Sequence, residues 1–126
     1  DALQTALPTW RRLMPETRHP HQTLWESEDW VLKPALGRVG EDVGIHGVTT
    51  PKEWRTITRN ARWFPKHWAA QRRFEAIPLQ AGSELAYPCL GIYVVDGQAE
   101  GAYVRLASRP LIDGKSRDAA LLVEAS

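Results

Sequence analysis

The segment Thr50-Pro51-Lys52-Glu53 constrains the fold of this 126-residue chain most strongly, because it marks the start of a helix. A threonine followed three residues later by a glutamate is a capping box, and proline suits the first position of a helix. Apolar residues then recur at positions 54, 57 and 61, the spacing of one helical face. The pattern predicts a helix from Pro51 to about Ala61.

Short runs rich in β-branched and aromatic residues flank this helix and predict strands. A turn at Asp96-Gly97 joins the last two long runs, and this dipeptide favours a tight hairpin. Pairs of strands separated by one helix predict an α+β fold with a mostly antiparallel sheet, not a doubly wound parallel sheet. The predicted strands cover residues 29–33, 42–48, 68–74, 85–95, 98–106 and 119–124, with a loop over 110–118.

Prolines at positions 8, 15 and 20 interrupt the first part of the chain. We therefore expect residues 1–28 to be an irregular lead-in from a preceding part of the protein, with a short helix over residues 9–14. Residues 29–126 are expected to form the folded subdomain. Because the chain opens without methionine, we interpret it as part of a larger protein.

The composition is that of a globular protein, with 43% hydrophobic and 25% charged residues. A net charge of +1 gives no reason to expect a nucleic acid or a membrane as partner, and no apolar run has membrane-spanning length. The single Cys89 excludes an intramolecular disulfide and favours a cytoplasmic location. Its apolar neighbours predict a buried, inert thiol. The six tryptophans, all within the first 68 residues, are expected to anchor packed layers.

Lys33 is the first candidate for chemistry, since it leaves a short apolar strand and enters a loop that contains Gly37 and Gly40. Glycine lets backbone N–H groups approach an anion closely, and an adjacent lysine supplies a point charge for phosphate. The spacing matches neither a Walker A loop nor a dinucleotide-binding fingerprint. An ordinary hairpin loop with an exposed lysine explains the same residues.

Arg105 is the second candidate, because strand alternation puts it on the face opposite to Val104 and Leu106. An arginine centred on a strand face needs an anion or a carboxylate, so a phosphate contact and a structural salt bridge both remain open. The four histidines lack the spacing of a zinc site, and no serine or cysteine hydrolase motif is present. Those histidines are His19, His21, His46 and His67.

Three segments resemble the C-terminal part of glutathionylspermidine synthase-like ligases, a circularly permuted branch of the ATP-grasp superfamily. Residues 31–45, VLKPALGRVGEDVGI, resemble the family's K-P-x-x-G-R-x-G-x-x-I loop. Residues 70–78 resemble its hinge strand and the proline-bearing turn that follows. Residues 93–105 resemble its terminal hairpin, in which a G-x-x-x-G stretch leads into an arginine.

The resemblance implies a nucleotide-binding, ATP-grasp-like subdomain over residues 29–126. Lys33 would contact the nucleotide phosphates, and the loop from Ala35 to Gly40 would fold over them as a lid. Backbone groups from Gln71 to Phe74 would form the adenine edge, and Arg105 would be a catalytic residue facing the γ-phosphate or an acyl phosphate. The implied loop contacts are Gly37, Arg38, Val39 and Gly40.

The implied reaction activates a carboxylate as an acyl phosphate, which an amine then attacks to form an amide, with release of ADP. ATP and Mg²⁺ are the implied cofactors, and the Mg²⁺ ligands are expected outside this chain, which has no Glu-x-Asn pair. The expected partners are the nucleotide, the carboxylate and amine substrates and the remainder of the parent enzyme. The chain alone is expected to be inactive. Two alternatives stay open: a non-catalytic α+β interaction module whose tryptophan-rich half docks a partner, and an ATP-grasp protein with a different substrate.

Overall fold

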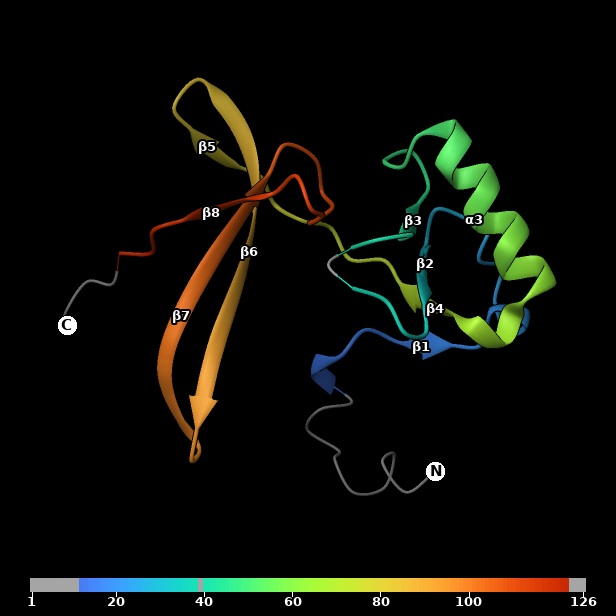
Figure 1. The fold of residues 1–126 in the computed structure, drawn as a ribbon, viewed down its shortest axis with the longest axis horizontal. Helices are drawn as coiled ribbons and strands as arrows, with labels where there is room; N and C mark the ends of the chain where they lie inside the picture. Colours follow the sequence, from blue (N-terminus) through green and yellow to red (C-terminus); the bar gives the residue numbers. More distant parts are fainter. Residues whose placement is uncertain (1–11, 39, 123–126) are drawn as a thin grey trace. The chain divides into compact units, whose positions relative to one another are not determined.

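The computed structural model describes residues 12–38 and 40–122 (Figure 1). The chain divides into two units, Asp1–Phe74 and Glu75–Ser126. Each contains a four-stranded antiparallel sheet in its described residues, and the first unit adds the helix α3. The predicted α+β class and the antiparallel pairing are confirmed.

In the first unit the strands lie in the order β1-β4-β2-β3. The central pair is β2 and β4, whose register places Leu32 opposite Ala70 and Lys33 opposite Ala69. Two short 3₁₀ helices, η1 (Pro20–Gln22) and η2 (Pro65–His67), precede β2 and β4. The strand bounds are β1 (Thr17–Arg18), β2 (Trp30–Pro34), β3 (Gly44–Ile45) and β4 (Trp68–Arg72).

The helix α3 (Pro51–Trp63) begins where the capping box predicts. The Glu53 amide donates to Thr50 Oγ1 at 3.3 Å, and the Thr50 amide donates to Glu53 Oε2 at 3.1 Å. Such a cap stabilises a helix by about 1 kcal/mol. The helix continues two residues beyond the predicted end, and the Phe64 amide closes it on the Asn60 carbonyl at 2.8 Å. Pro65 follows, and proline cannot continue the hydrogen-bond ladder.

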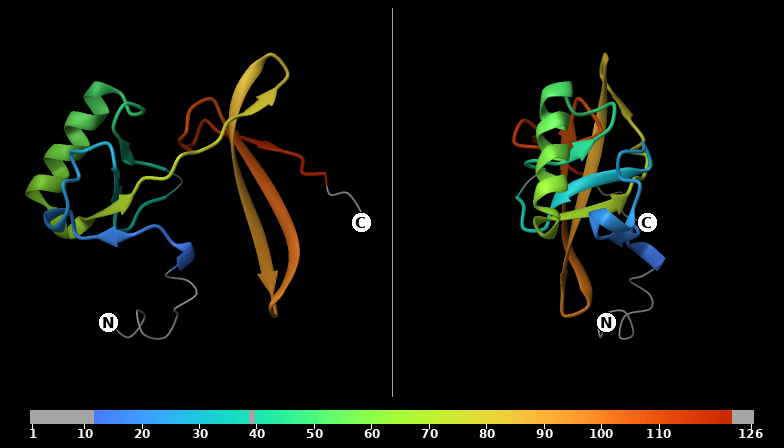
Figure 2. Two further views of the ribbon diagram at one scale, coloured as in Figure 1. Left: turned by 180° about the vertical axis from the view of Figure 1, so that it is seen from behind. Right: turned by 90° about the vertical axis from the view of Figure 1, so that its right-hand side faces the viewer.

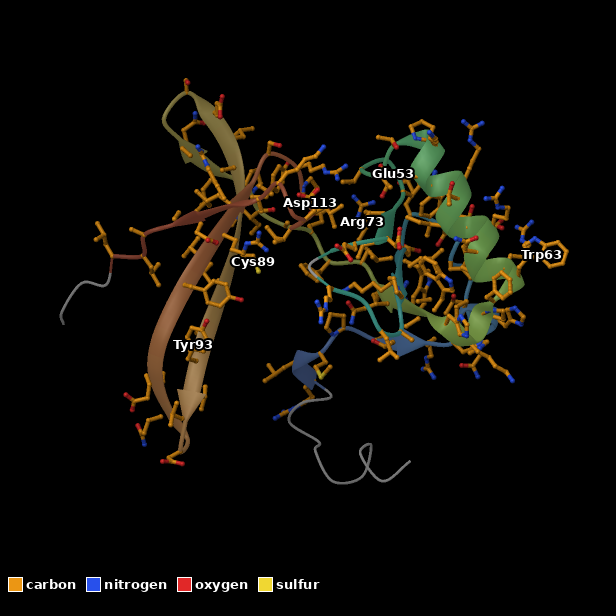
Figure 3. All side chains as sticks on the ribbon, in the orientation of Figure 1. Glu53, Trp63, Arg73, Cys89, Tyr93 and Asp113 are labelled. Carbon is orange, nitrogen blue, oxygen red and sulfur yellow. The ribbon has the colours of Figure 1, made fainter. Side chains whose placement is uncertain are left out.

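The core of the first unit lies between the sheet and α3, which runs along one sheet face in both views of Figure 2. Leu32 and Ala70 are completely buried on that face against Ile57 and Ala61 of the helix. Trp25, Trp30 and Trp68 join this cluster, so these three tryptophans do anchor the layers as predicted. Trp63 does not, since its side chain is 74% exposed and points away from the sheet (Figure 3).

In the second unit the strands lie in the order β5-β6-β7-β8. The predicted turn at Asp96-Gly97 is confirmed, because the two residues have φ angles of 50° and 81°, as a tight hairpin requires. An irregularity in the β6–β7 register lies between Tyr93 and Val94. The strand bounds are β5 (Leu79–Ala81), β6 (Glu84–Val95), β7 (Gln98–Ala107) and β8 (Arg117–Ala119).

The β6–β7 hairpin carries exposed apolar side chains over most of its length. The prediction of a buried Cys89 is wrong, because this thiol is exposed (Figure 3). Its apolar neighbours indicated burial, but in the described residues no second layer covers the hairpin there. The exposed apolar residues of the hairpin are Leu85, Leu90, Ile92, Tyr93, Val94, Val95 and Tyr103.

Several predicted boundaries need correction. The lead-in contains a strand and a 3₁₀ helix, because the backbone of residues 17 and 18 pairs with the outer edge of β4. The partner of β2 is two residues long where residues 42–48 were predicted, and the last strand begins earlier, at Arg117. The predicted helix over residues 9–14 falls largely outside the described residues. No helix in residues 12–38 or 40–122 is long and apolar enough to span a membrane.

Gly44 tests how closely β3 packs on α3. A Cβ atom at this position would lie 2.8 Å from Ile57 Cγ2 and 3.2 Å from Trp54 Cζ3. We therefore expect Gly44→Ala to lower the free energy of unfolding by about 1–3 kcal/mol, since the buried Ile57 side chain cannot move freely to make room for the methyl group. Urea unfolding of the first unit, followed by tryptophan fluorescence, measures the change.

Gly37→Ala is the matched control for this prediction. Its added Cβ would meet Pro34 at 3.4 Å, which is an ordinary van der Waals contact. Equal destabilisation by the two variants would contradict packing against α3 as the cause of the effect.

Candidate functional site

Lys33 lies near the end of β2, on the sheet face opposite to α3. Side chains alternate along a strand, so Leu32 points to the helix while Val31 and Lys33 point to the other face. On that face Val31 is paired with Ile45, and both are buried. The Lys33 side chain thus lies on the same sheet face as the apolar side chains of Val31 and Ile45, near the end of a central strand.

Gln71 is the partner that the structure gives to Lys33. The Lys33 Nζ donates to Gln71 Oε1 at 2.5 Å, across the two central strands. Within residues 12–38 and 40–122, no other acceptor and no carboxylate pairs with this ammonium. Burial lowers the pKa of Lys33 below its ordinary value of 10.5. The site therefore holds a partly buried cation with N–H donors to spare.

The loop after β2 begins with a backbone hydrogen bond to the residue before β4, and the next described amides have no backbone acceptor. The Ala35 amide donates to the His67 carbonyl at 2.8 Å, which extends the β2–β4 ladder by one residue. A turn follows, in which the Glu41 amide donates to the Arg38 carbonyl at 2.8 Å and Gly40 has a φ of 71°. Among the described residues, the amides of Leu36, Gly37 and Arg38 have no backbone acceptor.

The loop after β2 offers backbone donors next to Lys33. The loop residues from Ala35 to Arg38 are exposed. The N–H groups of Leu36, Gly37 and Arg38, which have no backbone acceptor among the described residues, follow directly after the strand that holds Lys33. Such groups can donate to an anion that the ammonium also contacts. The predicted contact at Val39 lies outside the described residues.

The expected adenine edge at Gln71–Phe74 has few free backbone donors. Because β4 lies between β1 and β2, both of its edges are paired. The amides of Arg72 and Arg73 donate to the carbonyls of Glu16 and Asp29, at 2.7 and 2.8 Å. The Phe74 side chain is exposed just beyond the strand. An adenine edge in this segment therefore has to use Phe74 or the residues after it.

Arg105 lies on β7 in the second unit, opposite Cys89 and away from the face of Val104, as alternation predicts. Its Nη2 donates to the carbonyls of Asp113 and Ser116, each at 3.2 Å, and its Nε lies 3.4 Å from Asp118 Oδ1. The side chain is only 22% exposed. Arg105 therefore holds the loop before β8, which is the structural role left open by its sequence position.

Asp113 organises this loop from within (Figure 3). Its Oδ2 accepts from Arg109 and its Oδ1 from the Lys115 amide, each at 2.8 Å. The hydrogen bond from Arg109, followed by that from Lys115, holds the pKa of Asp113 below its ordinary value. Nothing in the sequence marked Asp113, because its partners belong to a loop without periodicity.

The described residues contain no cluster of metal-binding side chains. Within residues 12–38 and 40–122, no group of three His, Cys, Asp or Glu side chains lies close enough together to hold a metal ion. Mg²⁺ binds through carboxylate oxygens in octahedral geometry.

Three comparisons bear on the family of this chain. Searches against family models, curated proteins and solved structures each found no match. The resemblance to permuted ATP-grasp ligases therefore stays a prediction that rests on the residues and their geometry.

The lowered pKa of Lys33 predicts a pH-dependent stability. Below the folded-state pKa, the charge on Lys33 opposes folding, and this cost disappears as the pH rises towards 10.5, where the unfolded chain also loses the proton. Relative to the wild type, the free energy of unfolding of Lys33→Met should therefore be highest at neutral pH. This advantage should disappear as the pH rises from the folded-state pKa of Lys33 to about 10.5. Urea unfolding at several pH values measures the difference.

Lys66→Met is the control, because Lys66 is exposed and removing its charge should leave the same comparison flat across the pH range. A stability difference for Lys33→Met that does not change with pH would mean that burial of the ammonium carries no cost.

Asp113→Ala should open the loop before β8, because it removes the acceptors of both Arg109 and Lys115. Cleavage by trypsin after Lys115 and Arg117 should then become faster. Asp118→Ala is the matched control: Asp118 is exposed and its contact with Arg105 at 3.4 Å is worth about 0–1 kcal/mol. Equal cleavage rates in the two variants would contradict the organising role of Asp113.

Proposed function

We propose that this chain is the nucleotide-binding part of an ATP-dependent carboxylate–amine ligase that resembles glutathionylspermidine synthase. The proposed reaction forms an amide through an acyl phosphate. In this proposal Lys33 contacts the phosphates of ATP, and Arg105 stabilises the charge that develops during phosphoryl transfer.

The single observation that supports this proposal best is the position of Lys33. A partly buried ammonium without a carboxylate partner among the described residues is unusual, because burial of a charge costs free energy unless it is compensated. A bound phosphate would compensate it. The same phosphate would accept from the free amides of Leu36, Gly37 and Arg38, which follow Lys33 directly.

Arg105 can contact a phosphate and keep its hydrogen bonds to the loop before β8 at the same time. Its Nη2 and Nε are engaged, but in the described residues its Nη1 has no acceptor. A guanidinium fixed by two carbonyls is a rigid donor, which suits charge that develops on a phosphoryl or acyl phosphate oxygen. In this proposal Asp113 and Ser116 position Arg105, and Arg105 alone contacts the reacting group.

ATP would supply the phosphoryl group that activates the carboxylate. The Mg²⁺ ligands would lie outside this chain, and no step is assigned here to Mg²⁺. Because Arg72 and Arg73 have paired amides, the adenine edge of the proposal moves to Phe74 and the residues after it.

A second candidate function is a non-catalytic interaction module. The exposed apolar side chains of the β6–β7 hairpin favour it, since a two-stranded ribbon with uncovered apolar side chains is only marginally stable in water. A ligase subunit would cover this hairpin with the remainder of the parent enzyme, whereas a docking module would cover it with a partner. The third hypothesis is an ATP-grasp protein that acts on another substrate.

Titration of the full protein with ATP in the presence of Mg²⁺ tests the proposal. We expect saturable binding in the wild type and a loss of affinity of about tenfold or more in Lys33→Ala, because a charge-assisted phosphate contact is removed. Tryptophan fluorescence or calorimetry gives the affinity. Lys66→Ala removes an exposed lysine of the same unit and should bind as the wild type does.

Arg105→Ala separates the proposed role of this arginine from simple binding. It should weaken ATP more than ADP, since the proposed contact is to the γ-phosphate. Release of ADP that depends on an added carboxylate and amine would distinguish a ligase from an ATP-grasp protein of other chemistry. Absence of nucleotide binding, or unchanged affinity in Lys33→Ala, would overturn the proposal and favour the interaction module.

A further inference from the structure

We propose that Thr17 is a positioning residue for Lys33, acting through the side-chain amide of Gln71. Thr17 comes from β1, at the edge of the sheet, and Gln71 lies between it and the strand that carries Lys33. The inference rests on the proposed function for its consequence, since it names a component of the same phosphate-binding site.

The three side chains form one directed chain of hydrogen bonds. Lys33 Nζ donates to Gln71 Oε1 at 2.5 Å, and Gln71 Nε2 donates to Thr17 Oγ1 at 3.2 Å. The Thr17 hydroxyl in turn donates to the Pro15 carbonyl at 3.1 Å. Every donor points the same way along this chain, so each bond polarises the next.

Thr17 holds the Gln71 amide in the orientation that presents its oxygen to Lys33. The ammonium has donors only, so it needs the amide oxygen and would be repelled by the amide nitrogen. The Thr17 hydroxyl donates a hydrogen bond to the Pro15 carbonyl, and its oxygen therefore presents a lone pair to the Gln71 NH₂ group. Without this acceptor, Lys33 alone would orient the Gln71 amide, and the hydrogen bond to Oε1 would be weaker.

No other charge on the neighbouring strands competes for this role. Arg18 on β1 and Arg72 on β4 flank Thr17 and Gln71, but strand alternation places both on the opposite sheet face. Both arginines lie within ion-pair distance of Glu16, at 2.8 and 3.9 Å. The Thr17–Gln71–Lys33 chain is thus the one polar connection from β1 to Lys33 among the described residues.

The test follows the Lys33 ammonium directly, by ¹⁵Nζ NMR titration of the nucleotide-free protein. Thr17→Val keeps the β-branched shape but removes the hydroxyl, and we expect the pKa of Lys33 to fall further because a hydrogen bond to its charged form is weakened. Thr17→Ser should restore the wild-type pKa. Thr56→Val alters an exposed threonine of α3 and serves as the matched control.

Gln71→Leu and Gln71→Glu keep the test decisive if Thr17→Val unpairs β1. The leucine removes the acceptor and should lower the pKa of Lys33, whereas the glutamate adds a charged acceptor and should raise it. ATP affinity should fall about threefold or more in Thr17→Val and recover in Thr17→Ser, since one weak hydrogen bond is removed and restored.

Failure of this inference differs from failure of the proposed function. If the Lys33 pKa and the ATP affinity are unchanged in Thr17→Val while Lys33→Ala loses ATP, Thr17 has no positioning role and the proposed function stands. If the Lys33 pKa follows Thr17 and Gln71 as expected but the wild type does not bind ATP, the positioning is real and the ligase proposal fails.

Discussion

The antiparallel pairing of β2 with β4 is the constraint on which the first unit depends. Because side chains alternate along each strand, one register assigns every residue of the pair to a face. It sends Leu32 and Ala70 into the core against α3, and it sends Lys33 and Gln71 to the other face. A slip of one residue would bury the lysine and expose the leucine. Core packing and the candidate site are therefore fixed by the same hydrogen bonds.

The two units are stabilised in different ways. The first has a true core between a sheet and a capped helix, in which fully buried side chains such as that of Leu32 contribute about 1.5–3 kcal/mol each. The second relies on backbone pairing along β6 and β7 and on the polar loop that Arg105 and Asp113 hold together. The positions of the residues in this loop therefore depend on hydrogen bonds more than on packing.

The sequence predicts well what local chemistry determines. The capping box marks the start of α3, and Asp96-Gly97 marks the hairpin turn, because both signals act within a few residues. Strand β1 escapes prediction, since two residues next to prolines show no periodicity and acquire strand geometry only from the edge of β4. The buried position predicted for Cys89 is wrong because an apolar run does not reveal whether a second layer covers it.

The candidate site was predictable only in part for the same reason. Lys33 and the glycine loop are adjacent in the sequence, so their association is local. The contact of Lys33 with Gln71 joins residues 38 positions apart, and that of Gln71 with Thr17 spans 54. Such contacts follow from strand order, which a single sequence does not display. Val39, which was also predicted to contact the nucleotide, lies outside the described residues.

The lengths of the strands in the second unit have one more consequence. Strand β5 pairs only with residues 84–86 of β6, and β8 only with residues 104–106 of β7. Along the rest of the hairpin, both outer edges therefore present backbone N–H and C=O groups without a neighbouring strand among the described residues. Such edges invite extension of the sheet by an added strand from another polypeptide segment. Pro88 on β6 and Glu100 on β7 disfavour non-specific strand pairing along these edges, because proline lacks an N–H donor and glutamate carries a charge.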